Sequence, residues 1–250
     1  MDPIKHDTKL ARSLDRAIVQ ADERYALFPQ NARVLIAVSG GKDSWALAWL
    51  LARYLERRPD ITLFASHIDL GFSGSEKFSR QAEEQLETLG IPCRVVRTKI
   101  GPEATDENAG KRPCFICTRR RREHLFETAR QLGCGHVAFG HHRDDVLVTF
   151  LLNLLVNREI STMTPCQEVF DGEYRIVRPM YMIDEEQISV LAGELNRSFS
   201  ANPCPVAGST MRKEMADLLA MLEKAHPDTR HNLFQALHNV KPDFLPSKKR

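Results

Sequence analysis

Residues 34–44 limit the fold of this 250-residue chain more than any other part of its sequence. They read Val-Leu-Ile-Ala-Val-Ser-Gly-Gly-Lys-Asp-Ser, so an apolar run stops abruptly and a helix-forming segment follows at once. This order is typical of a strand, a tight glycine turn and the N-terminus of a helix. Such a turn exposes backbone N–H groups and the positive end of a helix dipole, both of which attract phosphate. The segment therefore predicts a phosphate-binding loop.

The residue types in the turn support the same prediction. Glycine lets a phosphate approach the backbone closely, the serine hydroxyls can donate hydrogen bonds, and the lysine supplies a positive charge. The pattern differs from G-x-x-x-x-G-K-[ST], so the loop of the common nucleoside triphosphatases is absent. The alternative is an ordinary strand-to-helix turn without a ligand. Asp43 is also a candidate catalytic residue, and the predicted phosphate-binding residues are Ser39, Gly40, Gly41, Lys42, Asp43 and Ser44.

Strands and helices alternate along the first part of the chain. Apolar runs predict strands at 34–38, 61–68, 92–97 and 137–139, and the segments between and around them predict helices at 9–25, 45–55, 75–89, 115–132 and 144–155. Residues 99–113 are rich in glycine, proline and charge and predict a loop. The alternation predicts an α/β fold with a doubly wound parallel sheet, whose ligands bind at the carboxyl ends of the strands. His67, Ile68 and Asp69 end the second predicted strand and are expected to face the same crevice as the glycine turn.

The pattern changes after residue 165. Residues 174–178 predict a short strand, and residues 184–196, 210–225 and 228–237 predict helices. We therefore expect three regions along the chain. They are an N-terminal helix at 1–28, a phosphate-binding domain at 29–164 that carries a Cys-x-x-Cys pair, and a mainly helical region at 165–250 that ends in the basic tail Lys248-Lys249-Arg250.

Composition narrows the class of protein. A chain of this length with 42% apolar residues can bury a substantial core. No apolar run approaches the ~20 residues that cross a membrane, and the N-terminus lacks an apolar signal region. We therefore expect a cytoplasmic protein without a membrane partner. The formal net charge is only +2, but Arg119-Arg120-Arg121-Arg122 form a basic run that either contacts nucleic acid or is a solvated face.

A second polar turn follows the fourth predicted strand and reads Gly140-His-His-Arg-Asp144-Asp145. Carboxylates beside phosphates can hold Mg²⁺, which prefers carboxylate and phosphate oxygens. Asp144 and Asp145 are therefore candidate magnesium ligands, and an N-cap role for Asp144 is the alternative. Adjacent histidines do not converge easily on one zinc ion, so we expect them to position the backbone or contact a substrate.

The chain contains six cysteines, which in a cytoplasmic protein point away from a disulfide framework. Cys114 and Cys117 begin a predicted helix, where two thiols can converge on a metal centre and where the helix dipole and nearby arginines favour the thiolate. Four interpretations stay open: half of a zinc site, a redox pair, an iron–sulfur ligand pair, or two buried thiols. Cys204, on a proline-bounded loop, is a third candidate. The others are expected to be ordinary thiols: Cys93, Cys134 and Cys166.

Both polar turns resemble signatures of a known superfamily. The loop at 39–44 resembles the S-G-G-x-D-S loop of the pyrophosphatase-loop (PP-loop) ATP enzymes, and the turn at Gly140 resembles the G-H-H-x-D-D turn of their tRNA-modifying branch. In that superfamily the loop holds the terminal phosphates of ATP, which is cut between α and β while a substrate is adenylated. The resemblance implies that Asp145, and then Asp144, assist Mg²⁺ and ATP. It also implies that residues 67–69 contact adenine, largely through their backbone.

Over roughly residues 33–243 the chain is similar to the 2-thiocytidine synthetase family of tRNA sulfurtransferases. The features that carry this resemblance are the two turns, Pro113-Cys-x-x-Cys followed by arginines, Val177-Arg-Pro, a late Pro-Cys and Asn239-Val-x-Pro. In that family three cysteines hold a [4Fe–4S] cluster, and the matching positions, which are also candidate catalytic residues, are Cys114, Cys117 and Cys204. The family's late segment often reads P-C-x-x-C-G-S, and here Ala207 stands where its second cysteine would be.

The resemblance implies an ATP-dependent tRNA thiolase. ATP would adenylate the C2 oxygen of a cytidine, and sulfur held by an open iron would then displace AMP. The implied partners are tRNA, contacted by the arginine run, a sulfur donor such as a cysteine desulfurase, and a second copy of the chain. Two alternatives stay open. One is a ligase like lysidine synthetase with a structural zinc, and the other is a non-catalytic nucleotide- or RNA-binding module.

Overall fold

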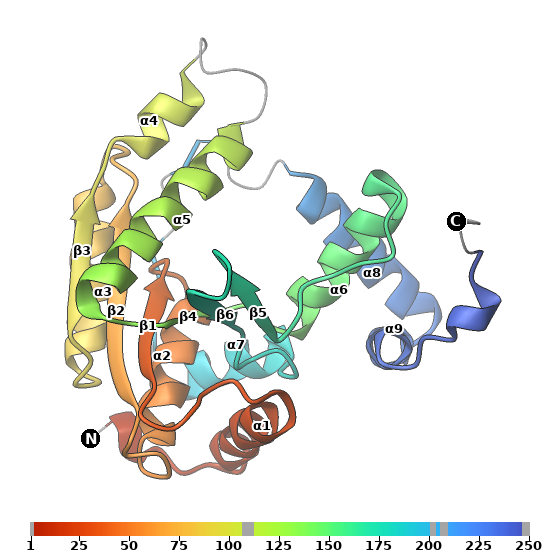
Figure 1. The fold of residues 1–250 in the computed structure, drawn as a ribbon, viewed down its shortest axis with the longest axis horizontal. Coiled ribbons are helices and arrows are strands. Elements are labelled where there is room, and N and C mark those ends of the chain that lie inside the picture. Colours follow the sequence, from red (N-terminus) through yellow and green to blue (C-terminus); the bar gives the residue numbers. More distant parts are fainter. Residues whose placement is uncertain (1–2, 107–112, 201–203, 206–209, 247–250) are drawn as a thin grey trace. The chain divides into compact units, whose positions relative to one another are not determined.

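The computed structural model describes residues 3–106, 113–200, 204–205 and 210–246 (Figure 1). Ala207 and the basic tail at 248–250 lie outside the described residues. The chain divides into two compact units, residues 1–142 with 164–207 and residues 143–163 with 208–250. These boundaries differ from the regions expected at 1–28, 29–164 and 165–250, because two strands and a helix after residue 164 complete the first unit. As functional domains, those three regions stay predictions.

The described part of the first unit is built on a six-stranded sheet in the order β3-β2-β1-β4-β6-β5. All neighbouring strands are parallel except β5, which pairs antiparallel with β6 at the edge. The strands are β1 (Arg33–Val38), β2 (Thr62–Asp69), β3 (Cys93–Arg97), β4 (His136–Phe139), β5 (Cys166–Val169) and β6 (Tyr174–Val177). The prediction of a doubly wound, mainly parallel α/β sheet is confirmed.

Helices cover both faces of the sheet, and the side chains of β1 alternate between two cores (Figure 1). Val34, Ile36 and Val38 face the core formed with α1 (Lys9–Tyr25), α2 (Lys42–Tyr54), α3 (Ser75–Glu87) and α7 (Glu185–Glu194). Leu35 and Ala37 face the core formed with α4 (Ile100–Thr105) and α5 (Pro113–Leu132). Successive strand residues point to opposite faces, so a continuous apolar strand is the expected sequence for burial on both sides. This burial fixes the carboxyl end of β1.

The strand order reverses between β1 and β4. From β1 the chain continues to β2 and β3 on one side, and β4 then pairs with the other side of β1. At such a reversal the connections leave on opposite faces and open a crevice at the carboxyl ends of the strands. The loop at 39–41 follows β1, and residues 140–142 follow β4. Both predicted turns therefore belong to the reversal point of the sheet.

One local prediction was wrong, and one strand was not predicted. The segment predicted as a loop contains α4, in which Ile100 and Ala104 are buried. Pro102 lies in the first turn of this helix, where backbone N–H groups have no partner within the helix, so proline is tolerated there. The strand β5 was not predicted, because it has only four residues and is defined by its pairing with β6.

The described part of the second unit is helical and contains α6 (Arg143–Leu152), the π-helical turn η2 (Asn153–Asn157), α8 (Met211–Ala225), α9 (Thr229–Leu237) and the 3₁₀ turn η3 (Pro242–Phe244). The helix α6 packs against α8 and α9. Thr210 caps α8 by accepting the backbone N–H of Lys213, as expected of a threonine N-cap. In the described part of the chain, no helix has the length and apolar character needed to cross a membrane.

A buried polar cluster joins α1 to the end of α2. Asp22 is 6% exposed, accepts hydrogen bonds from the Phe28 N–H at 2.9 Å and the Tyr54 hydroxyl at 2.7 Å, and pairs with Arg58 at 3.1 Å. Burial, followed by the contact with Asp22, raises the pKa of Tyr54 from 10.0 to about 12. The folded protein therefore holds the phenol proton more tightly than the unfolded chain does.

We expect the free energy of unfolding to fall as the pH rises from about 10 to about 12. The contribution of Tyr54 is complete below its ordinary pKa of 10.0 and is lost as the pH rises through about 12. Tyr54→Phe should lower the free energy of unfolding by about 1 kcal/mol near neutral pH. In alkali, the free energy of unfolding of this variant should fall less steeply with pH than that of the wild type. Urea unfolding across this range measures the difference, and Tyr181, whose pKa is also raised to about 12, stays in both proteins. Parallel declines in the two proteins would contradict the assignment.

Candidate functional site

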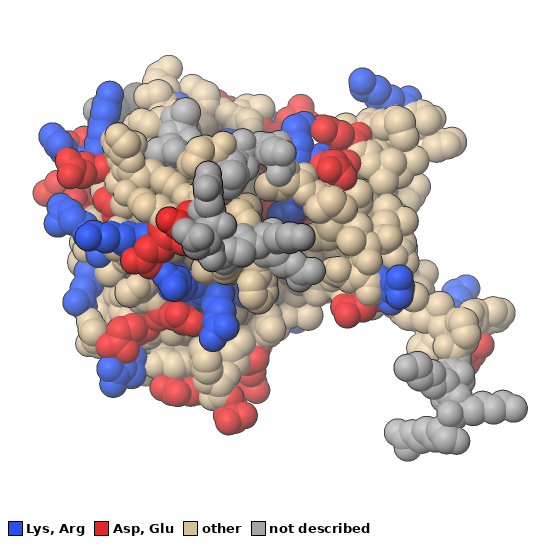
Figure 2. Space-filling view, turned by 90° about the horizontal axis from the view of Figure 1, so that it is seen from above, with Lys and Arg blue, Asp and Glu red and all other residues tan. Residues whose placement is uncertain are grey.

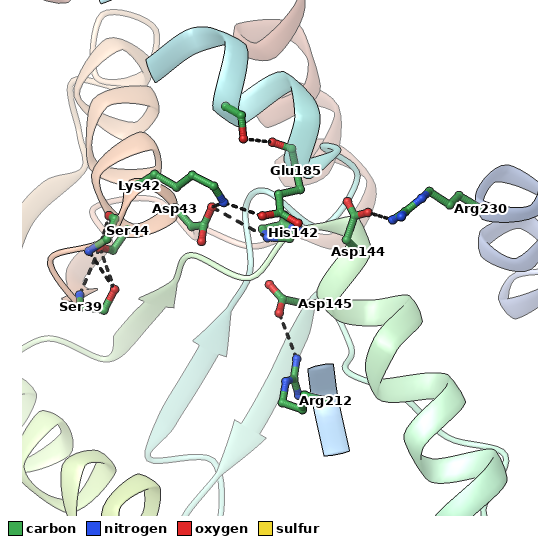
Figure 3. A network of polar contacts seen from close by, with 12 residues as sticks. Ser39, Lys42, Asp43, Ser44, His142, Asp144, Asp145, Glu185, Arg212 and Arg230 are labelled. Atoms are coloured by element: carbon green, nitrogen blue, oxygen red, sulfur yellow. Dashed lines mark hydrogen bonds and ion pairs between the residues drawn. The ribbon is translucent and has the colours of Figure 1, made fainter. Parts of the chain in front are cut away.

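The loop after β1 is held together by its own serines (Figure 3). The Ser44 Oγ accepts the Ser39 N–H at 3.1 Å, lies 3.1 Å from the Ser39 Oγ and donates to the Gly41 carbonyl at 3.0 Å. Gly41 is the N-cap of α2 and provides no side-chain cap. The first N–H groups of α2 are therefore directed at the loop without a capping side chain, which suits them to an anion.

Two glycines set the spacing around this loop. Gly40 has a φ of 85°, and a Cβ there would lie 2.4 Å from the Phe78 ring. A Cβ at Gly140 would lie 3.0 Å from the carbonyl carbon and oxygen of Asp43 and 3.1 Å from the Ser44 nitrogen. The turn after β4 therefore packs directly against the backbone at the start of α2.

Lys42 is held by two carboxylates (Figure 3). Its Nζ lies 2.7 Å from Asp43 Oδ1 and 2.7 Å from Glu185 Oε1. Burial acts to lower the pKa of Lys42, but the hydrogen bonds to Asp43 and Glu185 outweigh burial and raise it above its ordinary value. The buried His142 places its Nε2 3.9 Å from Asp43 Oδ1. Lys42 therefore stays protonated with two of its three donors engaged, and Glu185 and a phosphate on the loop would both draw on its charge.

A small pocket of about 70 Å³ lies at the carboxyl end of β2. The predicted residues that line it are Ser39, His67, Ile68 and Asp69, and they are joined by Leu70, Phe72, Ser75, Phe78 and Arg121. Ligand pockets usually measure about 300 Å³ or more. A nucleoside therefore enters this pocket only if the surrounding side chains shift.

Two of the predicted residues in this pocket have structural partners. His67 Nδ1 lies 3.0 Å from the Val38 carbonyl, and burial lowers the pKa of the imidazole, so the neutral ring donates from Nδ1. The Asp69 carboxylate accepts the Gly71 N–H and the Ser79 hydroxyl, both at 2.9 Å. Burial acts to raise the pKa of Asp69, but its hydrogen bonds outweigh burial and hold the pKa below its ordinary value. Asp69 therefore fixes the turn that shapes the pocket.

The four consecutive arginines do not form one surface. Arg119 pairs with Glu123 at 3.1 Å, Arg120 pairs with Glu103, and the Arg122 guanidinium lies 6.0 Å from the centre of the Phe139 ring. Arg121 is half-buried and lines the pocket at the end of β2. Since a helix turns once every ~3.6 residues, neighbouring side chains on α5 point in different directions. The helix therefore divides the four arginines among different surroundings, and their contact with RNA stays a prediction.

The first unit also contains the three candidate cluster cysteines. Cys114 is exposed, whereas Cys117 and Cys204 are half-buried. Burial raises the pKa of the Cys117 thiol, Arg121 opposes this rise, and a thiolate at Cys204 or Cys114 adds to it. Cys204 therefore lies within electrostatic range of Cys117. The expectation that the helix dipole and arginines favour the thiolate is wrong for Cys117, because burial dominates.

The described residues contain no group of three or more His, Cys, Asp or Glu side chains arranged to hold a single metal ion. A [4Fe–4S] cluster makes a different demand, because each cysteine binds its own iron and the sulfurs need not converge on one point. Among the other cysteines, burial raises the pKa of Cys93 to about 12 and of Cys134 to about 11, as expected of ordinary buried thiols.

The two candidate magnesium ligands lie in the second unit, and each is paired with an arginine (Figure 3). Asp144 pairs with Arg230, and Asp145 Oδ1 lies 3.0 Å from Arg212 Nη2. The helix α6 begins at Arg143, so Asp144 is in its first turn and the N-cap alternative is wrong. A cation at either carboxylate would share it with an arginine.

Comparison with known proteins identifies the family. A family model described as a PP-loop domain matches residues 6–204. A tRNA-cytidine(32) 2-sulfurtransferase from Anaeromyxobacter dehalogenans (strain 2CP-C) is 36% identical over 248 residues, which cover 95% of this chain and 82% of the relative. The chain belongs to the PP-loop family. The predicted kinship with the tRNA 2-thiocytidine synthetases is confirmed.

A second curated relative and one solved structure are also similar to this chain. A tRNA-cytidine(32) 2-sulfurtransferase from Pelobacter propionicus (strain DSM 2379 / NBRC 103807 / OttBd1) is 34% identical, over 94% of this chain and 88% of the relative. The solved structure of the U34-tRNA thiolase NcsA from Methanococcus maripaludis with its [4Fe–4S] cluster is 24% identical and has a TM-score of 0.77. That match covers 96% of this chain and 81% of the other, and it supports the PP-loop fold.

Several residues of this PP-loop site were not singled out from the sequence. Phe72 and Phe78 follow β2 and precede or begin α3, so their place after a ligand-facing strand was the available signal. Arg121 was noted only as part of a basic run. Glu185 lies 143 positions from Lys42 and gave no local signal, since its contact depends on the docking of α7 beside α2.

Proposed function

We propose that this PP-loop protein is an ATP-dependent tRNA sulfurtransferase that converts a cytidine into 2-thiocytidine. The observation that carries the proposal is 36% identity over 95% of the chain to an enzyme named tRNA-cytidine(32) 2-sulfurtransferase. The serine-stabilised loop after β1 supports it as a phosphate site. The ligase and the non-catalytic module are not favoured, because the relatives are named as sulfurtransferases.

The proposed reaction consists of two displacements. The C2 oxygen of cytidine attacks the α-phosphorus of ATP, the bond to the bridging oxygen of the β-phosphate breaks, and pyrophosphate leaves. A sulfide sulfur then adds to C2, the bond between C2 and oxygen breaks, and AMP leaves with that oxygen. Adenylation is required because the free C2 oxygen is a poor leaving group. Net, one cytidine, one ATP and one sulfide give one 2-thiocytidine, one AMP and one pyrophosphate.

The residues of the loop stabilise the pyrophosphate that leaves. The backbone of Gly40 and Gly41, the Ser39 hydroxyl and Lys42 supply hydrogen-bond donors and charge where negative charge develops. The pocket at the end of β2 receives the adenosine, beside Phe72 and Phe78. Arg121 brings a cation to the same pocket, and its guanidinium suits phosphate oxygens.

Cys114, Cys117 and Cys204 are proposed to hold a [4Fe–4S] cluster. The fit rests on three thiols in one unit, of which Cys117 lies within electrostatic range of the other two, and on Arg121, which offsets negative charge at Cys117. Three protein ligands leave one iron open, which when the cluster is bound supplies a place to hold sulfide near the activated carbon. The protein's own contribution is to orient the thiols and to keep Cys117 near the pocket-lining Arg121.

The magnesium site, the sulfur donor and the second copy of the chain are part of the same proposal. Asp145, with Asp144, binds the Mg²⁺ that accompanies the ATP phosphates. A cysteine desulfurase or similar donor supplies the sulfur, and the homodimer rests on the family resemblance alone. All six cysteines are free thiols, which suits the reducing cytoplasm, where we place the reaction.

Anaerobic reconstitution tests the function. The purified protein should contain iron and acid-labile sulfide and show the absorption spectrum of a cluster. With ATP, Mg²⁺, sulfide and unmodified tRNA, it should release AMP and pyrophosphate in step with 2-thiocytidine, measured by mass spectrometry of nucleosides. Zinc in place of iron, together with an amine adduct on the base, would favour the ligase. Failure to release pyrophosphate with any tRNA would contradict an ATP-using enzyme.

Removing the carboxylate of Glu185 should strengthen ATP binding. In Glu185→Gln, Lys42 keeps Asp43 but loses a 2.7 Å ion pair, so a phosphate meets less competition. Partly exposed ion pairs contribute about 0.2–1 kcal/mol, so the KM for ATP should fall by up to about five-fold. Glu186→Gln, at the next exposed position of α7, is the matched control. A KM that stays constant or rises in Glu185→Gln would contradict the competition between Glu185 and phosphate.

A further inference from the structure

A groove of about 610 Å³ lies between α5 and the β5–β6 hairpin of the first unit. The helix contributes Phe115, Arg119, Arg122 and Phe126, which recur at helical spacing and therefore share one face. The hairpin contributes Phe170. Among the residues that the structure describes, none that lines the groove also lines the pocket at the end of β2. Phe115 stands between Cys114 and Cys117 in the sequence, so the groove begins at the turn of α5 that carries the proposed cluster ligands.

The hairpin turn holds Phe170 in a strained conformation. Its φ is 53°, and that of Asp171 is 54°, a region that bulky side chains rarely occupy. The Phe170 ring stands edge-on to Phe126, with 4.9 Å between ring centres, yet the residue remains 60% exposed. Because the ring is mostly exposed, its burial offsets little of the backbone strain. Backbone strain of this kind clusters at binding sites, which points to a ligand for the exposed ring.

The other wall of the groove combines an exposed ring with cations. Phe115 is 65% exposed, although it lies in the first turn of α5. Arg119 and Arg122 lie one helical turn apart on the same face, and Glu123 neutralises part of the charge of Arg119. Exposed aromatic rings bind the faces of nucleobases, and guanidinium groups bind phosphates. The groove therefore offers both kinds of contact that a single-stranded nucleic acid uses.

We propose that this groove, which begins at the turn of α5 that carries the cysteine pair, binds an unpaired segment of the tRNA substrate. Bases stack on Phe115 and Phe170, and the backbone phosphates meet Arg119 and Arg122. The inference rests on the proposed function. An enzyme that modifies a base takes it out of the stack, and an RNA loop with unstacked bases presents the ring faces that phenylalanine can hold. A base-paired stem conceals those faces.

The distribution of charge makes such local contacts important. Figure 2 shows lysine and arginine side chains interspersed with aspartate and glutamate on the face seen from above, and the formal net charge is only +2. Affinity for nucleic acid that comes from phosphate contacts grows with the number of phosphates neutralised. A surface of mixed charge neutralises few phosphates, so stacking carries a larger share of the affinity.

The first test is direct binding of RNA by ring variants. The probes are an unstructured RNA oligonucleotide and a fully paired hairpin of equal length, measured by fluorescence anisotropy at one salt concentration. Phe115→Leu and Phe170→Leu keep apolar volume but remove the flat ring, and each should weaken binding of the single strand by about 5- to 150-fold. Binding of the hairpin should change less. Thermal unfolding confirms that each variant is folded, and Phe115, the more exposed of the two, remains informative if Phe170→Leu unfolds.

The second test separates the arginines of the groove from others on the same helix. Arg122→Gln should reduce the slope of log K against log salt by about 0.7, the value for one phosphate contact on a single strand. The control is Arg130→Gln, since Arg130 lies on α5 outside the groove and pairs with Glu127 at 2.8 Å. The control should leave the slope unchanged. Equal slopes for wild type and Arg122→Gln would count against a phosphate at that position.

The outcomes distinguish the groove from the proposed function. If the wild type thiolates tRNA and both ring variants bind single-stranded RNA normally, the groove assignment is wrong and the function stands. If the ring variants lose RNA binding but the wild type thiolates no tRNA, the function is wrong and the groove stands. If they bind RNA normally but fail only with a protein sulfur donor, and not with free sulfide, the groove binds that protein and our proposal is overturned.

Discussion

Cys117→Ala is expected to lower the rate of tRNA thiolation by about 10³-fold or more, since a sulfur held beside its target gains far more than this over one in free solution. Cys117 is half-buried and is the proposed ligand that lies within electrostatic range of both of the others, Cys114 and Cys204. Its loss should also reduce the iron content of the anaerobically purified protein. ATP binding should stay within about two-fold, a change of less than about 0.5 kcal/mol, because the cysteine lines neither the loop nor the pocket.

The controls for this prediction are the cysteines outside the proposed ligand set. Cys93→Ala and Cys166→Ala each remove a half-buried thiol of the same unit and should keep iron content and thiolation near the wild-type values. Cys114→Ala and Cys204→Ala should behave like Cys117→Ala. Full thiolation by any one of these three variants, with normal iron content, would remove that cysteine from the ligand set.

The sequence was most informative for elements whose apolar pattern matches the faces that they bury in the fold. The helix expected at 9–25 is α1, and the strand expected at 34–38 is β1 except for its first residue. Both elements are long enough to show a clear apolar pattern. The helix is apolar on the one face that meets a core, and the strand is apolar throughout 34–38 because it meets a core on each side. The four-residue β5 carries no such pattern, and α4 was hidden by a proline that its first turn tolerates. Short elements depend on partners elsewhere in the chain.

The candidate site was predictable as a set of turns but not as a set of contacts. The loop at 39–44 was indicated by its glycines, its serines and its position after a strand. These features depend only on residues that are neighbours in the sequence. The partner of Lys42 on α7 and the arginines paired with Asp144 and Asp145 come from distant segments, so no spacing revealed them. The division of the arginine run was in principle readable, since consecutive helical residues cannot share a face.

Gly140→Ala is expected to have the second large effect, and it tests the close contact between the turn after β4 and the start of α2. The added Cβ would lie 3.0 Å from the Asp43 carbonyl carbon and oxygen and 3.1 Å from the Ser44 nitrogen, and these are backbone atoms that cannot rotate away. The start of α2 must therefore move, and overpacking of this kind costs about 1–3 kcal/mol of stability. A displacement of about 1 Å at a reacting group can cost about 100-fold in rate, so we expect a comparable loss of ATP-dependent pyrophosphate release.

The control for this change is Gly135→Ala, just before β4, where a Cβ meets nothing within 4 Å. It shares the strand and the substitution but not the contact with α2, so stability and pyrophosphate release should stay near the wild-type values. Unfolding in urea separates the two contributions of Gly140→Ala, because the loss of rate should persist under conditions where the variant is fully folded. If the folded variant released pyrophosphate at the wild-type rate, the close approach of the two turns would have no part in binding ATP, and Gly140 would serve only the packing of the sheet.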